Sequence, residues 1–555
     1  MNLGTRHRWL LPRREFLRAT AMMSGCALCE QLIPFLDAQE NTASAAGTFT
    51  AAISVRGDSI LHKIDPKIYG TMIEHIGRGV YGGIYEEDSP LSDEDGFRKD
   101  VLAAGKEWGI PVFRWPGGNF ASDYHWIDGI GPKASRPKRY SYAWFEVDNN
   151  HFGTHEYIAY CRKLGTEPYM CVNLGTGTPE EAANWVQYCN GTSDSYFPNL
   201  RRKNGHEEPF NVKYWGLGNE VYGEWQVGHQ SAEGYANLAL EAAKLMKWAD
   251  PDIRVVAVGH DLDWNRTVLE TLVHIADYIS IHDYEGSPDY KEMLGSIQRF
   301  EKHIHDTEAL IDLTDHLRIM GDRNLESSLP KNKERIEIAI DEWNVWYRAH
   351  NFDYFTDQNG EKRRKDLPNP AEEVYNMRDA LWVASALNLF QRTAKSVTMA
   401  NLAQMVNILA PMLTSKTGLI LQPTYFPMKL YRQQSGANYL QAQVTSPTFS
   451  SKSFIDVPYL DISATTDDAR TFLALAVVNR HETQAASTNI RIDGMKLSTS
   501  VDNFEIVGPP DAQNTTADPH KIDIQQKKII VAGSTFDYSF PPHSVTMLKF
   551  NRTGT

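Results

Sequence analysis

Two short stretches of the chain end in acidic residues placed where chemistry could occur. Residues 214–220 (YWGLGNE) form an apolar run that ends at Glu220, and residues 336–347 (IEIAIDEWNVWY) alternate apolar residues before Glu342 and a group of aromatic residues. An apolar run followed at once by polar residues suits a buried parallel strand whose C-terminal end opens into a cleft. Two carboxylates on two such strand ends are the minimum equipment for acid–base or nucleophilic hydrolysis of glycosides.

A carboxylate at such a strand end lies partly out of water. Its pKa can therefore be raised enough for it to hold a proton near neutrality. For either motif alone, the alternative is a polar strand end that carries a solvated glutamate. The recurrence of the same pattern at Glu220 and Glu342 favours the catalytic interpretation.

Strand-like and helix-like segments alternate eight times between about residues 68 and 436. This alternation predicts a (β/α)₈ barrel rather than an open doubly wound sheet. The first strand is not followed by a Gly-rich dinucleotide loop, which disfavours the open sheet. In such barrels the chemistry lies at the C-terminal ends of the strands. The polar residues that fall at these ends are Glu74, Asn119, Glu220, Tyr284, Glu342 and Gln404.

The helical period disappears after about residue 436. Short alternating runs punctuated by Pro, Asn, Asp and Ser take over, which predicts an antiparallel, jelly-roll-like β-sandwich. Residues 47–65 also alternate without a helix and are expected to join that sandwich. We therefore predict an α/β protein with a catalytic barrel over residues 66–436 and an accessory sandwich built from residues 47–65 and 437–555.

The bulk composition narrows the classes of function. The chain has 555 residues, 42% of them hydrophobic, which is enough for one large domain and a smaller one. Its net charge of −14 and the lack of a basic block disfavour nucleic acid as a partner. The aromatic content of 11% suits stacking on sugar faces, although aromatic residues are more often part of a core.

The first 46 residues have the pattern of an export signal with a linker. Arg13-Arg14 precedes a modest apolar stretch and a small-residue segment, which predicts a twin-arginine signal and a periplasmic or extracellular location. The alternatives are a disordered basic N-terminus or lipidation at Cys26. No later stretch is long and apolar enough for membrane insertion. Three further cysteines (Cys161, Cys171 and Cys189) lie in apolar patterns and are expected to be buried, inert thiols.

A series of motifs runs along the predicted barrel in a fixed order. Laid side by side, they resemble the α-L-arabinofuranosidases of glycoside hydrolase family 51. The motifs are MIEH at 72–75, YGGIY at 81–85, RWPGGNF at 114–120, YHW at 124–126, DGIGP at 128–132, GNE at 218–220, WQVGH at 225–229, DEWNVWY at 341–347 and NLAQ at 401–404.

The resemblance implies a retaining hydrolase that releases terminal arabinofuranose from polysaccharides or oligosaccharides, with no cofactor or metal ion. Glu220 matches the general acid/base and Glu342 the nucleophile, while Arg114 matches a residue that supports the floor of the site. The resemblance also implies a homo-oligomer, often a hexamer. The positions that surround the furanose ring in the family are matched by Glu74, Asn119, Asn219, Tyr284 and Gln404.

Several of these side chains have a simpler interpretation from the residues alone. Tyr284 could orient Glu342 or merely pack, and Glu74 could bind ring hydroxyls or pair with Arg114. Trp126 could form a wall of the site or belong to the core. Asn219 could donate to a sugar hydroxyl or stabilise its loop. His282, like His75 and His125, is expected to support the site through hydrogen bonds, because no metal-ligand spacing links the three.

Retention requires two carboxyl groups about 5 Å apart. Glu342 must stay ionised to attack, and its charge is expected to raise the pKa of Glu220 so that Glu220 keeps a proton. Two departures from the family pattern, Tyr222 with Glu224 and the acidic segment after Tyr284, leave the leaving group open. An exported endo-β-glucanase of the same family and a non-catalytic carbohydrate-binding protein remain as competing functions.

Overall fold

The computed structural model describes residues 47–321, 334–347 and 371–554. The predicted twin-arginine motif at Arg13 and Arg14 and the possible lipidation site at Cys26 lie outside these residues. Among the described residues, no helix combines the length and the apolarity needed to cross a membrane.

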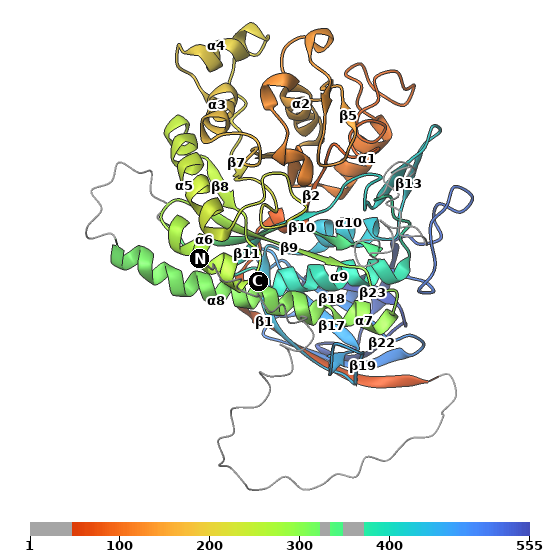
Figure 1. The fold of residues 1–555 in the computed structure, drawn as a ribbon. Helices are drawn as coiled ribbons and strands as arrows, with labels where there is room; N and C mark the ends of the chain where they lie inside the picture. The colour runs from red at the N-terminus through yellow and green to blue at the C-terminus, as the bar shows by residue number, and fades with distance from the viewer. Residues whose placement is uncertain (1–46, 322–333, 348–370, 555) are drawn as a thin grey trace, which may run out of the picture. The chain divides into compact units, whose positions relative to one another are not determined.

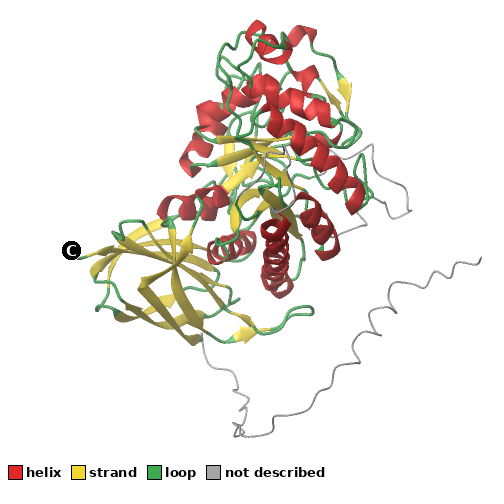
Figure 2. Ribbon diagram, turned by 90° about the vertical axis from the view of Figure 1, so that its left-hand side faces the viewer, coloured by secondary structure: helices red, strands yellow, loops and turns green. Residues whose placement is uncertain are grey.

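Eight parallel strands close into a barrel, and helices surround it (Figures 1 and 2). This confirms the predicted (β/α)₈ fold. Glu220 follows the fourth strand in chain order, and Glu342 lies in the seventh. In chain order the barrel strands are β2 (Gly70–Met72), β3 (Val112–Trp115), β6 (Glu167–Cys171), β7 (Tyr214–Gly216), β8 (Arg254–Ala257), β9 (Tyr278–Glu285), β10 (Glu337–Val345) and β11 (Val397–Leu402).

The helices begin and end where the sequence supplies caps. The hydroxyl of Thr178 accepts a hydrogen bond from the backbone of Glu181, and α1 and α2 end at glycines with left-handed backbone angles. Asn376 and Asp379 form a capping box at the start of α9. The helices are α1 (Lys99–Trp108), α2 (Thr154–Leu164), α3 (Pro179–Asn190), α4 (Tyr196–Lys203), α5 (Ala232–Ala249), α6 (Leu262–Leu272), α7 (Tyr290–Gly295), α8 (Ile297–Gly321), α9 (Met377–Arg392) and α10 (Tyr425–Gln434).

Buried side chains fill the barrel near the start of its strands. Seven strands each contribute one residue to this cluster: Val112, Tyr169, Tyr214, Val256, Tyr278, Ala339 and Met399. The remaining strand contributes Gly70, where a Cβ atom would lie only 2.5 Å from the side chain of Val112. This packed layer leaves the opposite, C-terminal end of the strands as the place where polar side chains can gather.

The C-terminal part forms a nine-stranded sheet around a second hydrophobic core, seen at the lower left of Figure 2. β1 lies inside this sheet, antiparallel to β14 and parallel to β19, so the accessory domain contains one parallel pair among its antiparallel ones. Ile53 and Val55 of β1 contribute to the core. The strands are β1 (Thr48–Lys63), β14 (Asn438–Thr445), β17 (Leu460–Thr466), β18 (Phe472–Asn479), β19 (Ala485–Asp493), β20 (Leu497–Val507), β21 (Gln525–Ile530), β22 (Thr535–Phe540) and β23 (Ser544–Arg552).

Short hairpins complete the fold. The β4–β5 hairpin (Arg139–Tyr140 with Val147–Asp148) lies between β3 and α2, and it carries Trp144 in its turn. Two further hairpins pair β12 (Met412–Thr414) with β13 (Leu419–Leu421) and β15 (Thr448–Phe449) with β16 (Val457–Pro458). Cys161, Cys171 and Cys189 are buried free thiols, as expected.

Candidate active site

Glu220 stands in a tight turn directly after β7. Its backbone adopts a left-handed conformation with φ of +42°, two residues after Gly218 with φ of +85°. The carbonyl of Glu220 accepts a hydrogen bond from the amide of Gly223 at 2.8 Å, which closes the turn. A non-glycine residue in this conformation costs on the order of 1 kcal/mol, and such strain is concentrated at functional sites. The turn aims the carboxylate back over the barrel mouth.

Glu342 lies within β10, where the strand register sets its neighbours. Glu342 is paired with His282 of β9, and Asn344 with Tyr284. Arg114 of β3 donates to Oε1 of Glu342 at 2.7 Å, and the hydroxyl of Tyr284 donates to Oε2 at 2.8 Å. Tyr284 therefore forms the orienting hydrogen bond expected from the sequence. Two donors from different strands fix both oxygens of this buried carboxylate.

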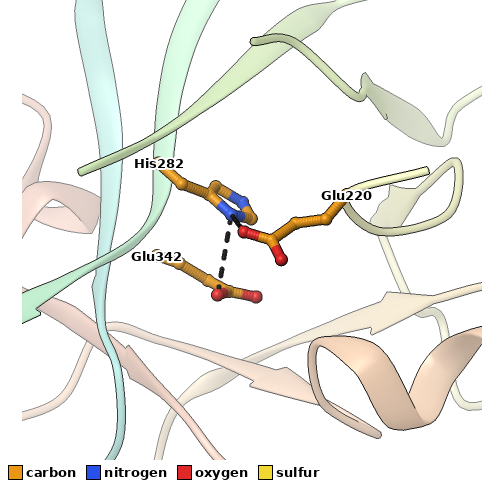
Figure 3. Close-up of side chains that lie close together, drawn as sticks. All are labelled: Glu220, His282 and Glu342. Atoms are coloured by element: carbon orange, nitrogen blue, oxygen red, sulfur yellow. Dashed lines mark hydrogen bonds and ion pairs between the residues drawn. The ribbon is translucent and has the colours of Figure 1, made fainter. Parts of the chain in front are cut away.

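The two glutamates face each other with His282 between them, as Figure 3 shows. One carboxylate oxygen of each and Nδ1 of His282 all lie within 4.8 Å of one another. The same ring nitrogen is 2.9 Å from Glu220 and 3.6 Å from Glu342. The sequence prediction that strands four and seven bring these two acids together across the barrel agrees with this geometry.

His282 joins three carboxylates. Its Nε2 donates to Asp341 at 3.0 Å, while Nδ1 faces Glu220 and Glu342. Burial alone would lower the pKa of His282, but Glu342, Asp341 and Glu220 raise it to about 10. Burial would raise the pKa of Asp341, but Arg114 and His282 lower it to about 2. The ring is therefore an imidazolium that donates from both nitrogens.

The raised pKa expected for Glu220 is wrong. Burial does tend to raise the pKa of Glu220, but the hydrogen bond and the charge of His282 outweigh it and hold this pKa below its usual range. The sequence argument considered only the charge of Glu342 and left out a cation on the neighbouring strand. His282, one hydrogen bond away, instead holds the proton.

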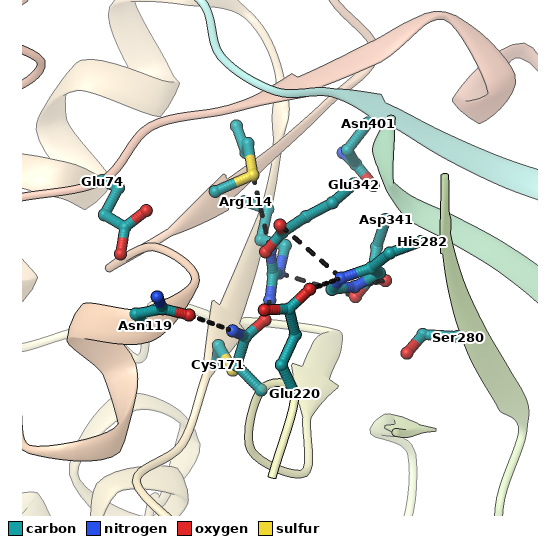
Figure 4. A network of polar contacts seen from close by, with 12 residues as sticks. Glu74, Arg114, Asn119, Cys171, Glu220, Ser280, His282, Asp341, Glu342 and Asn401 are labelled. Carbon is teal, nitrogen blue, oxygen red and sulfur yellow. Dashed lines mark hydrogen bonds and ion pairs between the residues drawn. The ribbon is translucent and has the colours of Figure 1, made fainter. Parts of the chain in front are cut away.

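Arg114 ties the two halves of the site together (Figure 4). Its guanidinium donates to Glu342 and, at 2.7 Å, to Oδ1 of Asn219. Nδ2 of Asn219 is then turned towards Oδ1 of Asn119 at 3.4 Å. This contact is long, so the amide hydrogens of Asn219 are available for a sugar hydroxyl. The pairing of Glu74 with Arg114 that the sequence left open does not occur: within the described part of the chain, the ion pairs of Arg114 are with Glu342 and Asp341.

Glu74 is almost completely buried beside this network. One of its oxygens accepts from the backbone of Phe120 at 2.8 Å and from the indole of Trp144 at 2.9 Å. Gln404 accepts from the backbone of Glu74 and approaches its other oxygen. Burial, followed by the charge of Glu342, raises the pKa of Glu74 to about 7. Near neutrality this carboxyl group can both donate and accept hydrogen bonds.

A pair of glycines makes room for both carboxylates. At Gly117, where φ is +143°, a Cβ atom would lie 2.3 Å from the side chain of Glu74. At Gly118 a Cβ atom would lie 2.7 Å from Oε1 of Glu342. The RWPGGN motif thus supplies Arg114 and Asn119 to the site and keeps the intervening backbone close to two acids.

Trp126 is not brought to these carboxylates by any contact in the structure. Its indole donates to the backbone of Glu181, and its ring stacks on Trp185 and packs against Tyr188 and Phe197. The structure favours the core alternative for this residue. One tryptophan that does reach the site is Trp144, whose place in a short hairpin gave no periodic signal in the sequence.

The two departures from the family pattern have different positions. After Tyr284, Glu285 is turned to the outside of the barrel, where Arg299 pairs with it at 3.2 Å and with Asp283 at 2.8 Å. Tyr222, in contrast, reaches Glu220: its hydroxyl donates to Oε1 at 3.1 Å. Trp225 also forms a hydrogen bond to Glu220, and its side chain is 67% exposed. The site therefore opens on the side of Tyr222 and Trp225.

Glu220, His282 and Glu342 are also the group of three potential metal ligands found among the described residues. The chemistry of the donor set does not suit a cation, because His282 is protonated and its two nitrogens are engaged with carboxylates. A protonated imidazole has no lone pair to offer a metal. The arrangement is a proton-sharing cluster.

Comparison with known proteins places the chain in a family. Family models described as "Alpha-L-arabinofuranosidase 1 domain" and "Alpha-L-arabinofuranosidase C-terminal domain" match residues 106–305 and 341–544. A probable α-L-arabinofuranosidase C of Aspergillus terreus is 40% identical over 524 residues, which cover 90% of this chain and 97% of the relative. A GH51 α-L-arabinofuranosidase structure from Thermotoga petrophila is 40% identical with a TM-score of 0.81, and the match covers 90% of this chain and all of that one.

The chain belongs to the α-L-arabinofuranosidases of glycoside hydrolase family 51.

Two further family 51 relatives extend the comparison to a liganded enzyme and to a bacterial one. The structure of an α-L-arabinofuranosidase from Thermotoga maritima, described as an arabinose complex, is 40% identical with a TM-score of 0.81, and the match covers 90% of this chain and 100% of that one. An intracellular exo-α-(1→5)-L-arabinofuranosidase of Bacillus subtilis is 39% identical over 78% of this chain and 85% of its own length. Family membership makes this chain a glycoside hydrolase, with the barrel and accessory domain described above.

Proposed function

We propose that this family 51 enzyme is an exo-acting, retaining α-L-arabinofuranosidase that removes terminal arabinofuranose from arabinose-containing glycans by double displacement. The observation that carries the proposal is the separation of Glu220 and Glu342, whose nearest oxygens lie within 4.8 Å of each other. Retaining enzymes hold their two carboxyl groups about 5 Å apart, whereas inverting enzymes leave about 6.5–9.5 Å for a water molecule.

In the first step Glu342 attacks the anomeric carbon. Arg114 and Tyr284 each donate a hydrogen bond to one oxygen of this carboxylate, so the nucleophile is preorganised before the substrate binds. The bond to the leaving oxygen breaks as the ester to Glu342 forms. Charge that develops on the sugar ring is stabilised by the surrounding buried carboxylates and dipoles in a site from which water is largely excluded.

The leaving oxygen takes its proton from Glu220. Before this step the proton rests on His282, which donates to Oε1 of Glu220 at 2.9 Å. The pair can hold the same proton on either partner, and the macroscopic titration belongs to both groups. When the charge of Glu342 is consumed in the ester, His282 loses the neighbour that contributes most to raising its pKa. Glu220 can then accept a proton from the incoming water, and the second displacement restores Glu342.

The side chains around the pair support recognition of a terminal furanose. Glu74, Asn219 and Gln404 are at most 4% exposed, so the polar groups beside Glu220 and Glu342 lie below the surface, a setting that suits the end of a glycan chain better than its middle. Asn219 and Glu74 offer donors and acceptors to ring hydroxyls. The name of the Bacillus subtilis relative, which specifies exo action on α-(1→5) linkages, supports the same mode for this chain.

The roles of the two glutamates are tested by truncating each in turn. Glu342→Ala removes the nucleophile and is expected to lower kcat on every aryl α-L-arabinofuranoside by about four orders of magnitude or more. Glu220→Ala removes only proton transfer, so activated leaving groups are spared while poor ones lose about 10²- to 10⁴-fold. Glu181→Ala, a glutamate outside the pair, is the matched control. Near wild-type rates of both site variants on a poor leaving group would contradict the assignment.

Substrate class and mode are tested with wild-type enzyme. Aryl arabinofuranoside, galactofuranoside and xyloside are compared side by side, and arabinan, arabinoxylan and β-glucan are digested separately. The expected products are single arabinose units from the arabinose-containing polymers. Oligosaccharides released from β-glucan would instead support the endo-acting alternative, and binding of arabinan without turnover would support a non-catalytic role.

A further inference from the structure

Tyr222 stands two residues after Glu220, in the turn where the chain departs from the family pattern. Its hydroxyl donates to Oε1 of Glu220 at 3.1 Å. His282 approaches the same oxygen from the opposite strand at 2.9 Å. Two donors therefore converge on Oε1 of the proposed acid, and Trp225 is a further hydrogen-bond partner of Glu220.

The ring of Tyr222 is held in place by other rings. It stacks on the imidazole of His260 with centroids 3.8 Å apart and planes 9° from parallel. The rings of Trp264 and Trp225 lie nearly perpendicular to the ring of Tyr222, with centroids 5.8 Å and 6.2 Å from its centroid. Trp264 is buried and donates to the backbone of Val258, so this side of the stack is fixed to the barrel.

His260 belongs to the loop between β8 and α6, and Tyr222 belongs to the turn after β7. The backbone amide of His260 donates to Asn265 at 2.7 Å, and its carbonyl accepts from His303 at 2.7 Å. These bonds hold His260 in place although its side chain is half-exposed. The stack thus joins two neighbouring loops at the side of Glu220.

The position of the donors decides where the proton of Glu220 arrives. Nδ1 of His282 is hydrogen-bonded to Oε1, so a proton that passes from the imidazole to Glu220 arrives on Oε1. The hydroxyl of Tyr222 donates to the same oxygen and so holds it beside the imidazole. A general acid is effective only when its proton lies within hydrogen-bond reach of the leaving oxygen.

We propose that Tyr222, braced by the stacked ring of His260, is a positioning residue that holds Oε1 of Glu220 within hydrogen-bond reach of His282, so that the proton carried by the imidazole can pass to Glu220 and on to the leaving group. The inference rests on the proposed function, because it assigns Tyr222 a part in the protonation step. The role is specific to leaving groups that need a proton, since Tyr222 does not touch the nucleophile Glu342.

The test measures kcat/KM over a series of aryl α-L-arabinofuranosides whose phenols differ in acidity. Tyr222→Phe keeps the ring and removes the hydroxyl. We expect it to lower kcat/KM about fivefold to tenfold for the unsubstituted phenyl glycoside and less than about twofold for the dinitrophenyl glycoside. His260→Ala keeps the hydroxyl but removes the brace, so a smaller change in the same direction is expected. Tyr196→Phe, on the exposed side of α4, is the matched control.

A merely structural role of Tyr222 would lower the rate equally for all leaving groups. An equal loss across the series, or no loss at all, in a Tyr222→Phe enzyme with an unchanged melting temperature would overturn the inference. An unchanged leaving-group dependence in His260→Ala would overturn the part assigned to the stack. These outcomes are distinct from failure of the proposed function, in which wild-type enzyme itself would not cleave the arabinofuranosides.

Discussion

At the scale of single residues, the proton shared by Glu220 and His282 governs the chemistry. His282 owes its positive charge to three carboxylates, two on β10 and one in the turn after β7, and Glu220 is the one of the three that must give a proton to the substrate. A pair coupled in this way loses its last proton only when the pKa of the stronger base is passed. Acid catalysis is thereby extended to higher pH than an isolated glutamate would permit.

Replacing His282 tests this coupling. In wild-type enzyme the raised pKa of His282, about 10, keeps the proton on the pair as pH rises. In His282→Gln the proton can be held only by Glu220, so the basic limb of kcat/KM is expected to move to lower pH. The measurement is a pH profile on a phenyl glycoside, which needs protonation. A basic limb that stays in place would show that His282 does not store the proton. His125→Gln, whose ring binds Glu181 outside the site, is the control.

Glu74 gives a second test through stability. The pKa of Glu74 in the folded protein is about 7, above the ordinary 4.5. The contribution of this carboxyl group to the free energy of unfolding is therefore fully present below pH 4.5 and is lost as the pH rises through 7. The loss amounts to about 3 kcal/mol, and Glu74→Gln, which cannot ionise, should escape it. We expect the melting temperature of the variant relative to wild type to rise between pH 4.5 and pH 8. A difference that stays constant with pH would contradict the raised pKa.

At the scale of elements, the site depends on strand register and on turns in unequal measure. Pairing of β9 with β10 sets Tyr284 and His282 beside Glu342 without any help from the loops. Glu220 instead owes its direction to a left-handed turn after β7. Rigid strands therefore hold the nucleophile, and a strained turn with its aromatic brace holds the acid.

Strand patterns made the main parts of this site predictable. Alternation placed Glu220, Glu342 and Gln404 at strand ends, and parallel strands of a barrel bring their ends together. Contacts made by turns and hairpins could not be predicted, because turn residues show no sequence periodicity. Trp144 and the stack of Tyr222 on His260 are two examples. The pKa of Glu220 could not be foreseen for a related reason: its direction depends on a partner 62 residues away.

In the accessory domain, β1 is the element that the rest of the sheet depends on. Val55 is 1% exposed in the core and lies between β14 and β19. Val55→Ala would leave a cavity and is expected to lower the free energy of unfolding by about 2 kcal/mol. Thr50→Ala, on the exposed face of the same strand, should change it by less than about 0.5 kcal/mol. Chemical denaturation of both variants measures the difference, and equal values would show that β1 is not central to the sheet.

At the scale of the whole molecule, barrel and accessory sheet share buried polar contacts. Arg392 at the end of α9 pairs with Asp461 of β17 at 2.8 Å, and Asn388 donates to the same carboxylate at 3.0 Å. The sheet therefore supports α9, which packs on β10, the strand that carries Glu342.

Export through a twin-arginine signal is a proposal of this scale. A double substitution of Arg13 and Arg14 by lysine should keep the activity in the cytoplasm. The wild-type sequence should instead place the activity in the periplasm or the medium. Activity is compared in cytoplasmic and exported fractions. Equal distribution of both forms would contradict export by this route. The hexamer that the family resemblance implies stays a prediction, to be tested by the mass of the enzyme in solution.

The stereochemistry of the first product tests the double displacement most directly. Cleavage of an aryl α-L-arabinofuranoside in the presence of methanol, followed by proton NMR, traps the product before the sugar can mutarotate. With Glu220 and Glu342 as close as they lie here, two successive inversions are expected, and methyl α-L-arabinofuranoside should be the product. The β-anomer would mean a single inversion and would contradict an intermediate on Glu342.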